Sequence, residues 1–128
     1  MKGAKRVVME RSVVDGLIAY AKSVHPNEGI LLLRGKVRKD EIRVTGLIIP
    51  PLPVHGEDFS SFNPYMLPFD ASILGVAHSH PSGVLMPSTQ DLLHYYGRIM
   101  VIVAYPYRGE EDIGVFDRDG NPAVFDVD

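Results

Sequence analysis

The chain has 128 residues, about the length of one domain, and that length is enough to bury a hydrophobic core without disulfides. Hydrophobic residues make up 45% and charged residues 23%, as in ordinary globular proteins, and the absence of Cys excludes disulfide scaffolds, thiol nucleophiles and thiolate zinc sites. A net charge of −3 and a pI near 5.9 argue against a broad basic surface for nucleic acid. No apolar run approaches the roughly 18 residues of a membrane span, and the start lacks a secretory signal. We therefore expect a cytoplasmic single domain, residues 1–128, with no nucleic-acid or membrane partner.

The first elements are a short strand and an amphipathic helix. Residues 7–9 are apolar and begin with two β-branched valines, which favours a strand. Apolar residues then recur at helical spacing up to Val24, and Ser12 with Asp15 resembles a capping pair at the start of the helix. The residue before Pro26 disfavours helical backbone angles, so the helix should end there.

A second group of strands follows. Residues 30–33 form a continuous apolar run, which predicts a buried strand. Residues 35–39 are predicted to turn the chain into an antiparallel strand at 42–49. The stretch 50–64 is rich in Pro, so we predict a long loop, a type of segment that often carries binding function.

The remaining elements complete a mixed sheet. Residues 73–77 and 99–105 are predicted strands, and a helix is expected at 88–96. A hairpin should join 115–116 to 124–125 through an Asp-Gly-Asn turn. Strands and helices do not alternate strictly, so we predict an α/β domain whose mixed sheet of about six strands is packed by helices.

The residues with the clearest chemical potential follow the strand at 73–77. On a strand, His78 and His80 share one face and lie about 7 Å apart. Asp91 falls in the first turn of the predicted helix, from where it can return to the same point. Two His and one carboxylate leave an open position on zinc, as catalytic sites do. The other histidines, His25, His55 and His94, have no comparable neighbours and are predicted surface or turn residues.

A simpler explanation exists for each part of this pattern. An isolated His-x-His is weak evidence for a metal. Ser88 followed three residues later by Asp91 also fits an ordinary helix cap. A cap and a metal ligand can coexist, because each side chain has more than one oxygen lone pair.

The complete pattern resembles the signature of the JAMM (MPN-plus) metalloprotease family. It comprises His78-x-His80-Pro, seven residues to Ser88, two further residues to Asp91, and an upstream Glu28 just before an apolar strand. The resemblance extends over nearly the whole chain. The chain is also similar in size to the compact archaeal and bacterial members of the family. It implies an MPN/JAMM-like fold, distantly similar to that of cytidine deaminases.

The resemblance also implies residue roles. His78, His80 and Asp91 match the ligands of a zinc ion. Glu28 matches the general base, and Ser88 matches the hydroxyl that stabilises the oxyanion. Relatives of this type cleave isopeptide bonds after the C-terminal glycine of ubiquitin-like proteins, which in archaea are small modifier proteins that also act as sulfur carriers.

The partner expected from the resemblance is therefore a ubiquitin-like modifier or its conjugates. Its extended tail would lie beside the active site, and the loops at 50–64 and 82–86 are predicted to wall the groove. His55, Phe59 and Phe62 of the first loop are available for contact.

Four alternatives stay open to different degrees. A zinc nucleobase deaminase needs His-x-Glu and paired Cys, which are absent. A JAMM protease that trims a sulfur-carrier protein to expose its Gly-Gly end is not separable by sequence. A non-catalytic MPN scaffold usually lacks the ligands or the Glu, and both are present. A DNA-repair relative is disfavoured by the net charge of −3. The identity of the modifier and the oligomeric state do not follow from the sequence.

Overall fold

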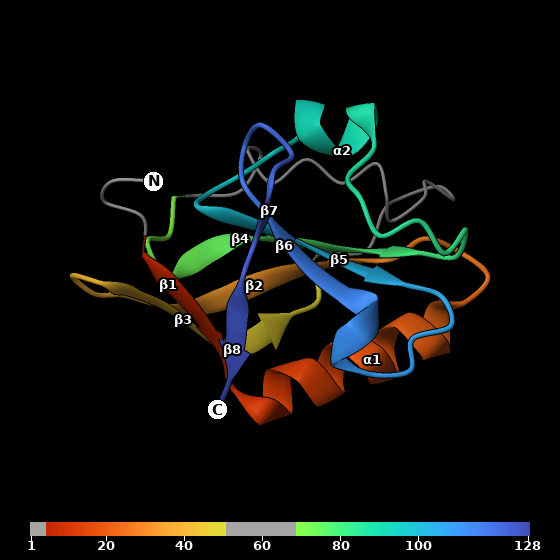
Figure 1. Cartoon of the computed structure of the whole chain (residues 1–128), viewed down its shortest axis with the longest axis horizontal. Helices are drawn as coiled ribbons and strands as arrows, with labels where there is room; N and C mark the ends of the chain where they lie inside the picture. Colours follow the sequence, from red (N-terminus) through yellow and green to blue (C-terminus); the bar gives the residue numbers. More distant parts are fainter. Residues whose placement is uncertain (1–4, 51–68) are drawn as a thin grey trace.

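A computed structural model of the chain describes residues 5–50 and 69–128. One sheet contains eight strands in the order β7-β6-β5-β4-β2-β3-β1-β8. Figure 1 shows α1 on one side of this sheet and α2 on the other. The elements in chain order are β1 (Arg6–Met9), α1 (Arg11–Val24), β2 (Ile30–Val37), β3 (Glu41–Ile48), β4 (Ile73–His80), α2 (Thr89–Leu93), β5 (Ile99–Ala104), η3 (Glu110–Asp112), β6 (Ile113–Phe116), β7 (Pro122–Ala123) and β8 (Phe125–Val127).

The sheet is mixed, as predicted. β4 and β5 are parallel, and β1 is parallel to both β3 and β8, whereas β2 is antiparallel to β3 and β4. β6 is antiparallel to both of its neighbours, β5 and β7. The prediction of about six strands was too low, because the segment after β6 contributes two short strands at opposite edges of the sheet.

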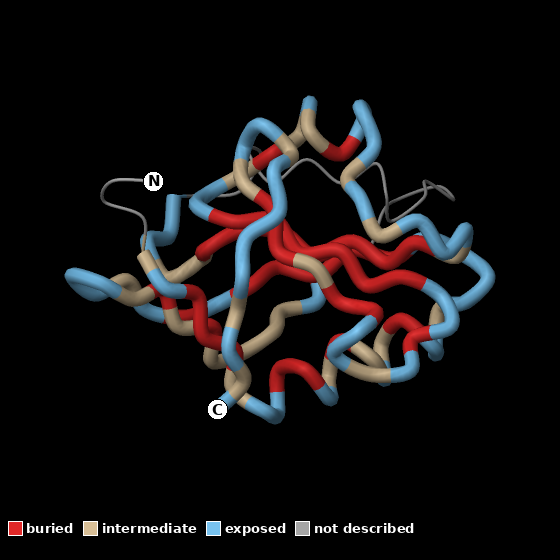
Figure 2. The backbone as a smooth tube through the Cα atoms, viewed as in Figure 1, coloured by how far each residue is buried: buried red, intermediate tan, exposed pale blue. Residues whose placement is uncertain are grey.

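The main core lies between α1 and the sheet. The helix buries Val13, Val14, Leu17 and Ala21, which pack in one cluster with residues from most of the strands. Figure 2 shows the central strands as a continuous buried layer under exposed connecting segments. The helical periodicity of the sequence therefore identified the correct buried face.

The predicted cap of α1 was wrong. The helix begins at Arg11, its N-cap is Glu10, and no side chain caps it; Ser12 lies inside the first turn. The reason is tertiary, because backbone bonds to neighbouring strands fix the entry to the helix. Glu10 N donates to Val44 O at 3.1 Å and Arg11 N donates to Asp128 O at 2.8 Å. These carbonyls satisfy donors that an isolated helix would leave to a cap.

The predicted turn at 35–39 was also wrong in part, because β2 continues through Gly35 to Val37. The pairing of β2 with β3 shifts register between Arg34 and Gly35. At this bulge a Cβ on Gly35 would lie 1.9 Å from the carbonyl oxygen of Arg43. The glycine therefore permits a close approach of two strands, and the turn itself follows later.

The C-terminal hairpin differs from the predicted one in its second strand. Val115 pairs with Ala123 and Phe116 with Pro122, and Gly120 takes a φ of 81° in the turn. Phe125 instead belongs to β8, which pairs with β1 at the far edge of the sheet. The Asp-Gly-Asn turn was identified correctly, but sequence did not reveal that the chain crosses to another strand after Ala123.

The helix predicted at 88–96 is only five residues long. After α2, His94 N donates to Asp91 O and Tyr95 N donates to Leu92 O, and Gly97 has a φ of 77°. Tyr95 is buried against residues of β5 and β6. Packing of this ring ends the helix early, although the helical pattern continues.

Segments that are far apart in the sequence meet at the end of β4, a central strand of the sheet. β4 lies between β2 and β5, with Ile30 opposite His78 and His80 opposite Ala104. Continuing the first register by two residues puts Glu28 opposite His80. In the described part of the chain, no helix has the length and apolar character needed to cross a membrane.

Candidate metal centre

The two histidines project from the end of β4 into a buried site. His78 is 6% exposed and His80 is 5% exposed. They lie on one face of the strand because their positions differ by two. The following Pro81 begins a turn in which Gly83 N donates to His80 O at 3.1 Å.

Asp91 comes from α2 and meets both histidines. Its Oδ2 lies 2.9 Å from Nε2 of His80, and its Oδ1 lies 3.7 Å from Nδ1 of His78. A capping box fixes the carboxylate, because Asp91 N donates to Ser88 Oγ at 3.0 Å and Ser88 N donates to Asp91 Oδ2 at 2.9 Å. The cap predicted from the sequence thus exists and holds Asp91 against the histidine pair.

The charges in this cluster are shifted in different directions. Burial lowers the pKa of His78, which favours a neutral ring. Burial also lowers the pKa of His80, but hydrogen bonds to Asp91 and to the Val84 carbonyl outweigh it, so the pKa of His80 is raised. Burial raises the pKa of Asp91, yet the hydrogen bond from His80 and the neighbouring His78 bring it down to about 2. Asp91 is therefore an ionised carboxylate at neutral pH.

The donor set fits a metal ion, although the side chains contact one another rather than surround an open point. Nε2 of His78 is buried and has no hydrogen-bond partner among the described residues. His80 places Nδ1 2.8 Å from the Val84 carbonyl, the kind of backbone contact that orients metal-binding imidazoles. Within residues 5–50 and 69–128 no three His, Asp or Glu side chains converge as a ready-made metal cage. Metal binding would exchange the His80–Asp91 hydrogen bond for bonds to the ion.

Glu28 lies at the rim of this cluster. It directly precedes the buried Gly29 and is itself exposed. Its negative charge makes a small contribution to the raised pKa of His80. No hydrogen bond or ion pair involves its carboxylate in the described part of the structure, so the group can accept a proton from a substrate or water.

Ser88 is exposed at the N-terminus of α2. Its hydroxyl oxygen accepts the Asp91 amide hydrogen, which uses one lone pair. The hydroxyl hydrogen stays available to donate, since a serine hydroxyl has one donor and two acceptor positions. The structure thus brings His78, His80, Ser88 and Asp91 into one cluster of contacts. The fifth predicted residue, Glu28, is placed opposite His80 by the register of β2 and β4, without a direct contact to the cluster among the described residues.

Sequence reasoning missed two supporting residues. Ser79 lies between the histidines but on the opposite face of β4, where its Oγ accepts the amide hydrogen of Gly29 at 2.8 Å. His25, predicted to be a surface or turn residue, is exposed in the turn after α1, but it also stacks on Tyr105 and places Nδ1 2.9 Å from the Tyr107 hydroxyl. The alternation of β4 was the available signal for Ser79. The contact between His25 and Tyr107 joins residues 82 positions apart, and no feature of the sequence indicated it.

Of the two predicted groove walls, residues 82–86 lie beside His80. Val84 and Met86 are 53% and 60% exposed, which makes an apolar rim next to the histidine pair. The other wall, at 50–64, lies outside the described residues apart from Pro50, together with His55, Phe59 and Phe62.

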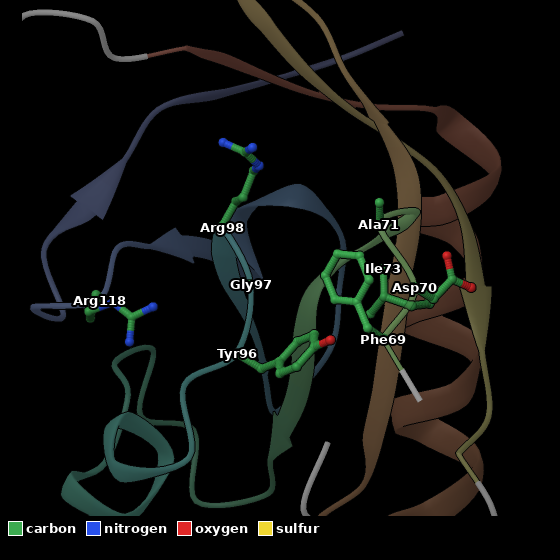
Figure 3. Close-up of a pocket in the computed structure, with 8 residues that line it drawn as sticks. All are labelled: Phe69, Asp70, Ala71, Ile73, Tyr96, Gly97, Arg98 and Arg118. Carbon is green, nitrogen blue, oxygen red and sulfur yellow. The ribbon is translucent and has the colours of Figure 1, made fainter. Parts of the chain in front are cut away.

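A separate cavity of about 500 Å³ opens at the other end of β4. Figure 3 shows Phe69, Tyr96, Arg98 and Arg118 among the residues that line it. It contains none of the five predicted site residues. Its lining includes the Asp70 carboxylate and two arginines but no His, so among the described residues it lacks a His–carboxylate cluster like the one at the end of β4.

Comparison with known proteins agrees with the fold and with the family resemblance. The model of the family Prok-JAB, prokaryotic homologues of the JAB domain, matches residues 10–114. A probable metalloprotease of Haloferax volcanii is 35% identical over 121 residues, covering 89% of this chain and 74% of that protein.

Two solved structures resemble the whole chain. A JAB1/MPN domain protein of Archaeoglobus fulgidus is 28% identical, with a TM-score of 0.69 and coverage of 100% of this chain and 99% of that one. A structure of the JAMM metalloprotease-like zinc site of the proteasome and signalosome is 27% identical, with a TM-score of 0.67 and coverage of 98% of each chain.

The mixed sheet with two helices is thus the fold of JAB1/MPN proteins. The chain belongs to the prokaryotic JAB-domain family, within the JAMM metalloprotease group.

Proposed function

We propose that the chain is a zinc-dependent isopeptidase. Its substrate would be a conjugate of a ubiquitin-like small modifier protein, cleaved after the C-terminal glycine of the modifier. The observation that carries this proposal is the buried cluster of His78, His80 and Asp91 with an unpartnered imidazole nitrogen. The strand register places the exposed Glu28 opposite His80. The archaeal origin of a 35% identical probable metalloprotease supports a modifier of archaeal type.

In this proposal His78, His80 and Asp91 hold one zinc ion. When bound, zinc lowers the pKa of a water molecule to about 7 and polarises the scissile carbonyl. Three protein ligands leave the position that such chemistry needs. The capping box and the Val84 carbonyl hold Asp91 and His80 in place.

The remaining chemistry belongs to Glu28 and Ser88. Glu28 takes the proton of the attacking water and delivers it to the leaving lysine amine, as a general base that becomes a general acid. The Ser88 hydroxyl donates to the carbonyl oxygen as negative charge develops on it. The modifier tail would lie along the rim formed by Val84 and Met86, where an extended peptide has apolar contacts.

A panel of substrates distinguishes this function from its alternatives. Zinc-loaded protein is incubated with a modifier–lysine conjugate and with a linear fusion that extends the same modifier beyond its Gly-Gly end. Mass spectrometry of the products, with and without a chelator, reads the result. Chelator-sensitive cleavage of the conjugate is expected. Cleavage confined to the linear fusion would favour trimming of a sulfur carrier, and binding without cleavage would favour a non-catalytic scaffold.

A further inference from the structure

The segment that carries Glu28, residues 25–29, is held at both ends by side chains outside it. We propose that Ser79 and Tyr107 are positioning residues that aim the Glu28 carboxylate at the reacting water. This inference rests on the proposed function, because it assigns the two residues to the general base of that reaction.

The first anchor lies directly after Glu28. Ser79 is 4% exposed, its Oγ accepts the Gly29 amide hydrogen at 2.8 Å, and its own amide donates to Gly29 O at 3.1 Å. Both polar groups of the Gly29 backbone are therefore bonded to the residue between the two histidines. The Tyr20 ring packs tightly over Gly29, since a Cβ at this position would lie 2.6 Å from the Cε2 atom of Tyr20. The backbone beyond Glu28 is fixed to the strand that carries His78 and His80.

The second anchor lies three residues before Glu28. His25 Nδ1 and the Tyr107 hydroxyl are 2.9 Å apart, and Tyr107 is only 2% exposed. The His25 ring also stacks on Tyr105, with ring centroids 4.9 Å apart and an interplanar angle of 17°. Tyr107 N donates to Ala104 O at 2.9 Å, at the end of β5. This end of the segment is therefore fixed to the end of β5, the strand that pairs with β4.

Anchoring of this kind matters because Glu28 has no anchor of its own. Its side chain is exposed and makes no hydrogen bond in the described part of the structure. A general base must lie within about 2.6–3.2 Å of the atom that gives up its proton. A displacement of about 1 Å can lower a rate by about 10²-fold. The backbone at residues 25–29 must therefore supply the precision that the side chain lacks.

The test compares Ser79→Ala and Tyr107→Phe with the wild type. Each should lower kcat by at least about tenfold, within the loss of about 10²-fold that misplacement causes, with KM and zinc content close to the wild type. The Tm of Ser79→Ala should also fall, because the buried Gly29 amide loses its acceptor. Ser79→Thr keeps the hydroxyl and should restore kcat. Ser72→Ala and Tyr105→Phe are matched controls that should keep kcat. Among the described residues the Ser72 hydroxyl bonds only Asp70, and the Tyr105 hydroxyl makes no hydrogen bond, while Phe keeps the ring that stacks on His25.

A double-mutant comparison shows whether the anchors act through Glu28. In a Glu28→Ala background, adding Ser79→Ala or Tyr107→Phe should cause no further loss of rate, because the group that they position is gone. Full additivity would overturn the proposal. Loss of zinc in Ser79→Ala would also overturn it, because the residue would then act on the metal centre.

Amide exchange in the metal-free protein gives a readout that does not depend on activity. Exchange of the Gly29 amide, followed by NMR, should accelerate in Ser79→Ala and stay slow in Ser79→Thr. If the wild type hydrolyses no conjugate, the proposed function fails, and unchanged Gly29 exchange would separately overturn the anchor. If Glu28→Ala is inactive while Ser79→Ala and Tyr107→Phe keep the wild-type kcat, the proposed function survives and the positioning role is wrong.

Discussion

Nε2 of His78 lies in a buried position and has no hydrogen-bond partner among the described residues. Buried polar atoms without partners are rare in folded proteins, so each one needs a physical explanation. A neutral imidazole is a good zinc ligand, and burial lowers the pKa of His78 in that direction. The same nitrogen would be an unexplained defect if the cluster were only structural.

The ligand assignment predicts the zinc content of single variants. Wild-type protein should bind about one equivalent of zinc, as measured by elemental analysis after metal loading. His78→Ala and Asp91→Ala should lose most of it, because two ligands rarely hold zinc alone. His94→Ala is the control for a nearby histidine that is not a proposed ligand. The charge of His94 acts on His78, but among the described residues its ring bonds the Gln90 carbonyl, so the variant should keep its zinc. Full zinc content in both ligand variants would show that the assignment is wrong.

Ser88 is the residue at which a structural role and a catalytic role meet. It caps α2 in the structure, so Ser88→Ala should lower the free energy of unfolding by about 1 kcal/mol, whereas Ser88→Gly should lower it by only a few tenths. As an oxyanion donor, its loss should reduce kcat in both variants by at least about tenfold, a deliberately low threshold beneath the usual 10²–10³-fold. Steady-state kinetics and chemical denaturation separate the two effects. Normal kcat in Ser88→Gly would leave the residue with the capping role alone.

At the scale of elements, the sequence predicted best where local pattern and tertiary packing agree. The buried face of α1 followed from helical spacing, and β4 and β5 followed from apolar runs. Predictions failed where contacts with distant parts of the chain decided the outcome. The start of α1 depends on the carbonyls of Val44 and Asp128, and Tyr95, just after α2, packs against Phe116 of β6. Neither partner is visible in a local window of sequence.

The candidate site followed from the sequence for a related reason. His78 and His80 share a face by strand alternation, and Ser88 and Asp91 lie within one helical turn, so their geometry is local. The position of Glu28 depends on the pairing of β2 with β4, which the sequence did not predict. The family resemblance pointed to Glu28 as a site residue without that pairing. The contact between His25 and Tyr107 depends on tertiary structure alone and was not predicted.

The bulge in β2 provides a prediction about strand packing. Gly35→Ala should destabilise the fold by about 1–3 kcal/mol, because the new Cβ would lie 1.9 Å from the Arg43 carbonyl oxygen and the backbone would have to shift. Gly46→Ala is a matched control on the adjacent strand. Its Cβ would meet Arg34 Cβ at an ordinary 4.0 Å, so its denaturation midpoint should stay close to the wild type. Equal effects of the two substitutions would contradict the assigned register.

At the scale of the whole molecule, the core is separate from the metal centre. α1 and the strands bury one large apolar cluster that contains none of the proposed ligands. The metal-free protein should therefore keep its far-ultraviolet circular dichroism spectrum, with a lower Tm. Zinc binds the folded protein only, so zinc at about 100 times its dissociation constant should raise the free energy of unfolding by about 2.7 kcal/mol. Unfolding on addition of a chelator would show that the core depends on the ion.

The central claim is that this chain hydrolyses a peptide or isopeptide bond with Glu28 as the proton carrier. Its most direct test is the rate at which zinc-loaded wild type and Glu28→Ala cleave a modifier–lysine conjugate, with zinc content measured in the same samples. We predict that the variant keeps about one zinc per chain, as the wild type does, and cleaves about 10²–10⁴-fold more slowly, the usual contribution of a general acid–base group. Wild-type cleavage by Glu28→Ala with its zinc in place would contradict the account.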